Sequence, residues 1–125
     1  MRRIGLFLII AGLLTACSSQ EQKPDLETPI MVEFSYSPNE LKVGDVDTLQ
    51  VVVKQGQDLV SDSKDVKFEV WKDGEEKHEM IDAENKGKGV YTALEKFHEP
   101  GVYHIMYHVT ARGMHEMKSQ KFQVK

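Results

Sequence analysis

Residues 66–72 read VKFEVWK, alternate apolar with polar side chains, and end at the turn dipeptide Asp73-Gly74. A period of two is typical of a half-buried β-strand and not of a helix. Six further short runs between turn residues indicate strands, at 30–36, 48–54, 77–81, 89–97, 102–111 and 118–125. Seven strands and no convincing helix predict an all-β, immunoglobulin-like sandwich, with a cupredoxin-like β-sandwich as the alternative.

The run 102–111 resembles the penultimate strand of such a sandwich, in which a tyrosine near the strand start anchors the corner. Alternation then assigns its side chains to two faces. The residues expected to face the core are Tyr103, Ile105, Tyr107 and Val109, and those expected to face outward are His104, Met106, His108 and Thr110. Trp71 competes with Phe68 and Val70 for the core, and either face is open to it.

The composition excludes several function classes. The 125 residues suit one domain, and 16 Lys+Arg against 20 Asp+Glu give a net charge of −4. A nucleic-acid binder is not expected, because there is no excess of positive charge to meet phosphates. The sequence also lacks a glycine-rich phosphate loop and a nucleophile elbow, so we do not expect an enzyme.

The N-terminal residues resemble a lipoprotein signal. Two arginines precede the short apolar run 4–14, which ends in Leu14-Thr15-Ala16-Cys17. Cys17 is the only cysteine and occupies the position whose thiol receives the lipid. We therefore expect a signal peptide at 1–16, a lipidated Cys17 with a flexible tether over 17–28, and a domain at 29–125. The chain would be lipid-anchored on the extracytoplasmic face of the cell membrane; an ordinary signal peptide with an incidental cysteine is the alternative.

Histidine and methionine cluster in the second half of the chain. All five histidines lie between His78 and His115, and four methionines lie between Met80 and Met117. Thioether and imidazole are donors for copper, because soft sulfur suits Cu(I) and imidazole serves both oxidation states. The predicted metal ligands are His78, Met80, His108, Met114, His115 and Met117. For any one of them taken alone, a solvated surface residue or a core methionine is the favoured interpretation, and metal binding is favoured only for the whole set on one surface.

Two registers are possible for the last two strands. A two-residue turn at Arg112-Gly113 puts His108 opposite Met117 and His115 opposite Thr110. That register aims three polar side chains at the core, those of Glu116, Lys118 and Gln120. The other register, shifted by two residues, puts Phe122 opposite Ile105 and turns 110–117 into a loop.

Several segments form a pattern in their order and spacing: LTAC at 14–17, FEVWK at 68–72, HEMI at 78–81, GVY at 89–91 and 101–103, and HVTARGMH at 108–115. Together they resemble the bacterial YtkA-like lipoproteins. The resemblance implies an immunoglobulin-like sandwich and a copper role linked to assembly of the copper centre of cytochrome oxidase. It carries over the ligand positions His78, Met80, His108 and His115.

The expected function is that of a membrane-anchored, extracytoplasmic copper-binding accessory protein. It would hold or deliver copper for respiratory oxidase assembly or copper homeostasis. Its partners would be the lipid membrane and a cytochrome oxidase subunit or another copper chaperone. The alternative is an immunoglobulin-like structural or interaction lipoprotein that binds protein or cell-wall components without metal.

Overall fold

Residues 28–125 are described by the computed structural model, and these residues form nine β-strands without a helix. The strands are β1 (Ile30–Ser37), β2 (Val46–Gln55), β3 (Asp58–Leu59), β4 (Asp65–Lys72), β5 (Glu79–Asp82), β6 (Glu84–Gly87), β7 (Val90–Lys96), β8 (Gly101–Ala111) and β9 (Met114–Val124). The predicted signal peptide and Cys17 lie outside the described residues. Within residues 28–125, no helix is long and apolar enough to cross a membrane.

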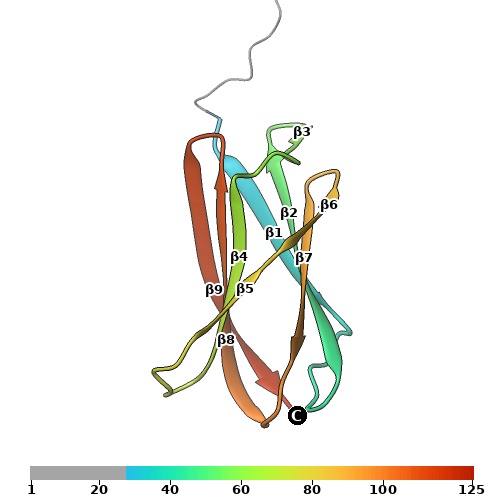
Figure 1. Ribbon diagram of the computed structural model, residues 1–125, viewed down its shortest axis with the longest axis vertical. Coiled ribbons are helices and arrows are strands. Elements are labelled where there is room, and N and C mark those ends of the chain that lie inside the picture. The colour runs from blue at the N-terminus through green and yellow to red at the C-terminus, as the bar shows by residue number, and fades with distance from the viewer. Residues whose placement is uncertain (1–27) are drawn as a thin grey trace, which may run out of the picture.

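The strands form two antiparallel sheets that face one another (Figure 1). The first sheet has the order β1-β2-β7-β6, with the two-residue β3 paired to β2, and the second has the order β5-β4-β8-β9. These are the two sheets of an immunoglobulin-like sandwich, in which strands A, B, E and D form one sheet and strands C, F and G form the other. The predicted all-β sandwich is confirmed, and each of the seven predicted runs overlaps an observed strand.

The core lies between the inner faces of the two sheets. Leu49 from β2, Phe68 from β4 and Ile105 and Val109 from β8 are 1% exposed or less. They are the apolar members of the alternating runs, which confirms the predicted faces of β8. Trp71 lies on the opposite face of β4 from Phe68, because the two residues differ in parity.

The predicted corner tyrosine is present at the start of β8. The Tyr103 hydroxyl donates a hydrogen bond of 2.9 Å to the backbone carbonyl of Glu99. Its ring packs edge-on against Phe97, with the ring centroids 4.7 Å apart. This contact fixes the chain where it crosses from the first sheet to the second, as in other immunoglobulin-like domains.

A tight two-residue turn joins β8 to β9. Arg112 and Gly113 have φ values of 51° and 76°, which is the geometry of a type I′ hairpin. The register puts His108 opposite Met117 and Thr110 opposite His115, so the alternative with a loop over 110–117 is wrong. The three polar side chains on the inner face of β9 are exposed, because the middle of this edge strand is not covered.

Replacing Gly89 with alanine is expected to destabilise the fold by about 2 kcal/mol or more. Gly89 has a φ of +76°, and an added Cβ would lie 2.6 Å from the carbonyl oxygen of Val53. That oxygen belongs to the backbone of a buried strand and has no room to move. Gly74→Ala is the matched control, since Gly74 has a φ of +83° with nothing within 4 Å of its Cβ position.

In the Gly74→Ala control, the free energy of unfolding should fall by only about 1 kcal/mol, which is the cost of the left-handed backbone alone. Urea unfolding of both variants measures the difference. Equal losses in the two variants would contradict the predicted clash at position 89.

Candidate functional site: a histidine and methionine face

One face of the second sheet gathers most of the predicted ligands. We call it the outer face, and it consists of Lys67, Glu69, Trp71, Met80, His104, Met106, His108, Thr110, His115 and Met117. Strand pairing sets these residues side by side. Glu69 pairs with Met80 on one side and with Met106 on the other, while His108 pairs with Lys67 and Met117. The predicted proximity of His108 and Met117 follows from this register.

Glu69 lies between two imidazole rings that come from different segments. Its Oε2 is 3.2 Å from Nδ1 of His78, which lies just before β5. Its Oε1 is 3.6 Å from Nε2 of His108 on β8. The second distance is too long for a hydrogen bond, and Nε2 of His108 is buried without a hydrogen-bond partner. The Glu69 carboxylate thus lies between two of the predicted ligands, and the buried Nε2 of His108 remains without a hydrogen-bond partner.

His115 and Met117 lie on the other side of His108. The His108 and His115 rings have centroids 5.9 Å apart and are tilted by 40°. Nδ1 of His115 and the Thr110 hydroxyl are 2.8 Å apart, and this contact fixes the orientation of the His115 ring. Thr110 is the cross-strand neighbour of His115 that the sequence predicted. His108 is therefore the central donor of the outer face, with a carboxylate on one side and a second imidazole on the other.

Trp71 forms a three-ring stack with two histidines. Its ring centroid is 4.2 Å from that of His78 and 4.8 Å from that of His104, and all three rings are nearly parallel. His104 is held on its other side by Asp73, with 2.7 Å between Nε2 and Oδ1. This hydrogen bond, aided by the charge of Lys121, lowers the pKa of Asp73. The stack holds the His78 ring beside Glu69, although His78 lies outside the strands.

The three predicted methionine ligands do not lie together: Met114 is on the other face of the sheet, and Met80 and Met117 are far from each other. Met114 packs against the core on the inner face of β9, because adjacent residues in a strand point to opposite faces. Met80 on β5 and Met117 on β9 are separated by three strand spacings, or about 14 Å. One ion cannot contact both. An ion held by His108 and His115 has Met117 beside it, whereas Met80 is beside Glu69 and His78.

The outer face carries imidazole, thioether and carboxylate side chains that could bind a metal, in an open arrangement. Among residues 28–125, no group of three histidine, cysteine or carboxylate side chains is already close enough to hold an ion. The unsatisfied Nε2 of His108 and the exposed thioethers of Met80 and Met117 fit a site that closes by side-chain rotation. Imidazole and thioether are suitable donors for copper, and carboxylate is the harder alternative donor.

Glu69 and the Trp71 stack are the site features that the sequence interpretation missed. Val66, Phe68 and Val70 are apolar and buried, so alternation alone indicates that Glu69 and Trp71 face outward. Alternation does not predict which residues lie beside Glu69 and Trp71, because that depends on β4 lying between β5 and β8 in the sheet.

The molecule is a small immunoglobulin-like sandwich with a donor-rich outer face. The chain belongs to the YtkA-like family, whose sequence model matches residues 26–108. This match covers β1 to β7 and most of β8, and it ends at His108. A comparison with curated protein sequences gives no match.

Similar solved structures confirm the fold. An engineered protein has a TM-score of 0.61 at 17% identity, covering 78% of this chain and 20% of that one. An endo-β-1,4-mannanase from Thermotoga petrophila has a TM-score of 0.55 at 13% identity, covering 78% of this chain and 20% of the mannanase. The PmoD soluble domain from Methylocystis sp. has a TM-score of 0.53 at 15% identity, covering 76% and 91%. This chain thus matches only about a fifth of the first two proteins.

Proposed function

We propose that this chain is an extracytoplasmic copper-binding accessory protein, anchored to the membrane by a lipid on Cys17. The observation that carries the proposal is the position of Glu69 between the rings of His78 and His108. Exposed methionines lie on both sides of this group, with Met80 paired to Glu69 and Met117 paired to His108. The family resemblance, which implies copper handling, supports the same function.

The donor set suits a protein that holds copper and passes it on. His108 and His78 would supply nitrogen to the ion and exchange their present contacts with Glu69 for it. A methionine beside either histidine would add a soft donor, which keeps Cu(I) exchangeable. Because the outer face is open, a partner could offer its own ligands before the ion leaves. The proposed recipient is a cytochrome oxidase subunit or another copper chaperone, in oxidase assembly or copper homeostasis.

A Cu(I) titration of the purified chain against a chromophoric chelator tests this function, with Zn²⁺ as the control metal. We expect uptake of a single equivalent of Cu(I) and little affinity for Zn²⁺, because a zinc site has no use for thioethers. Glu69→Gln should change the affinity, whereas Glu33→Gln, on an exposed position of β1, should not. Failure of the protein to compete for Cu(I) would refute the proposal.

Copper binding is also expected to quench the fluorescence of Trp71. Trp71 is the only tryptophan in the chain, and its ring centroid is 4.2 Å from that of His78. An ion bound to His78 would therefore lie close to the indole. We expect emission to fall in proportion to bound copper and to stop falling at one equivalent. Emission that stays constant while copper binds would place the ion away from His78.

A further inference from the structure

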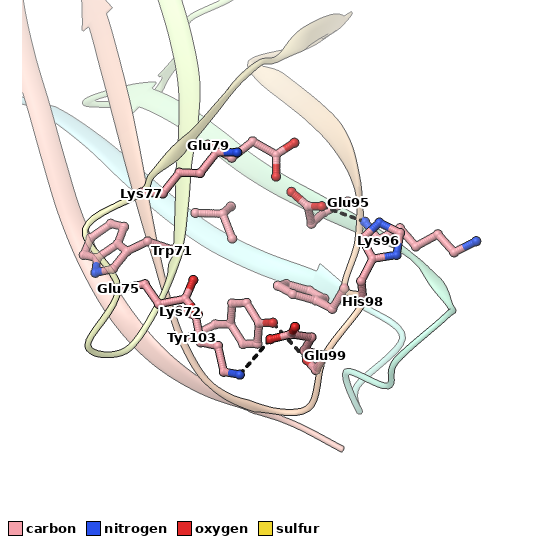
Figure 2. A pocket seen from close by; sticks show the side chains of 12 residues that line it. Trp71, Lys72, Glu75, Lys77, Glu79, Glu95, Lys96, His98, Glu99 and Tyr103 are labelled. Carbon is pink, nitrogen blue, oxygen red and sulfur yellow. Dashed lines mark hydrogen bonds and ion pairs between the residues drawn. The ribbon is translucent and has the colours of Figure 1, made fainter.

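A second candidate site lies at the end of the sandwich where β7 passes β4 and β5. A cavity of about 430 Å³ opens there, lined by residues of both sheets (Figure 2). Its lining combines the apolar and aromatic side chains of Val70, Trp71, Phe97 and Tyr103 with charged side chains from both sheets. Two carboxylates, Glu79 from the second sheet and Glu95 from the first, point toward one another across it (Figure 2).

Glu95 lacks a partner for one of its two oxygens. The residue is only 8% exposed, and its Oε1 accepts a hydrogen bond of 2.8 Å from the backbone N–H of Lys96. Its Oε2 is buried, has no hydrogen-bond partner and faces the Glu79 carboxylate. A buried carboxylate oxygen left without a donor is costly, so the pair favours a proton or another positive group between the two acids.

A second unpartnered carboxylate increases the negative charge. Asp47 on β2 pairs with Glu95 on β7, and both residues face the interior. Asp47 is fully buried, and neither of its carboxylate oxygens has a hydrogen-bond partner. Asp47 does not line the cavity, but its charge acts on Glu95 and contributes to the raised pKa of that carboxyl.

The lysines around the cavity do not supply the missing charge. Lys72 forms an ion pair with Glu99, with 3.0 Å between Nζ and Oε2. The Lys96 side chain points away from the cavity in Figure 2, and Lys77 is exposed. In the part of the chain that the structure describes, no lysine forms an ion pair with Glu79 or Glu95.

We propose that this cavity binds a primary ammonium group carried on a short apolar stem. An ammonium has three N–H donors, which match the acceptors offered by Glu79 and Glu95. The stem would pack against Phe97 and Tyr103, whose ring faces also attract a cation.

Binding of n-butylammonium to the copper-free chain at pH 8 tests the proposal, followed by backbone amide NMR. Burial and the charges of Glu79 and Asp47 raise the pKa of Glu95 to about 7, so this pH leaves the carboxylate ionised. We expect saturable shifts at residues 79, 95 and 97. The neutral analogue 1-butanol should produce much weaker shifts, because it lacks the positive charge that Glu79 and Glu95 would bind.

Glu95→Gln and Glu79→Gln should each weaken binding of n-butylammonium by about tenfold or more. Glu33→Gln, at an exposed position of β1 that does not line the cavity, should leave it unchanged. Equal shifts with 1-butanol, or unchanged affinity in both cavity variants, would overturn the proposal. No saturable shift up to roughly 100 mM would do the same, and would leave a proton as the only positive group between the two acids.

Discussion

Replacing His108 with alanine is expected to weaken copper binding by at least about 100-fold. His108 is the only residue of the outer face with Glu69 and His78 on one side and His115 and Met117 on the other. Loss of its ring therefore removes the donor that lies between the Glu69 and His78 group and the His115 and Met117 group. Residues that only orient a ligand already contribute 10- to 100-fold in metal affinity, so a ligand should contribute at least the upper value.

His98→Ala is the control for this experiment. His98 is exposed beyond the end of β7 and is not part of the outer face. Chelator competition should give the same copper affinity for His98→Ala as for the unmodified chain. Circular dichroism should show that both variants keep their β-structure. If His108→Ala and His98→Ala retained equal affinity, the ion would have to bind elsewhere.

The second large effect concerns stability and pH. Burial, with the nearby charges of Glu79 and Asp47, raises the pKa of Glu95 from 4.5 to about 7 in the folded state. Between these values the folded chain holds a proton that the unfolded chain has released. The contribution of Glu95 to the free energy of unfolding is therefore highest below about pH 4.5 and falls as the pH rises toward 7. A shift of this size corresponds to a loss of about 3 kcal/mol.

Glu95→Gln should remove most of that pH dependence, because a neutral amide has no proton to lose. Burial also raises the pKa of Asp47, which leaves a smaller slope of the same sign. Urea unfolding of both proteins at several pH values between 4.5 and 8 measures the effect, with Glu33→Gln as a control that keeps the full slope. A slope in Glu95→Gln as steep as in the unmodified chain would show that Glu95 is not the group responsible.

The sequence predicted most of the fold because its strands alternate clearly. Segment 66–72 and segment 102–111 both have the faces that their periodicity indicates. The strand β6 was missed because its sequence, ENKG, has no apolar alternation, and it forms only through pairing with β7. The polar inner face of β9 argued against the correct register, since whether an edge strand is covered depends on the opposite sheet.

The candidate site was predictable only where it depends on local geometry. The proximity of His108 to Met117 follows from one tight turn, and the separate place of Met114 follows from simple alternation. The contacts of Glu69 with His78 and His108 join three segments of the chain. They depend on β4 lying between β5 and β8, a long-range arrangement that local periodicity does not encode.

The central claim is that copper binds at the outer face through His78 and His108. The most direct test is the ¹⁵N NMR spectrum of the histidine ring nitrogens during a Cu(I) titration of the purified chain. We predict that ring signals of His78 and His108 shift and saturate at one equivalent, while those of His98 do not change. Saturable copper binding that leaves the signals of both His78 and His108 unchanged would contradict the claim.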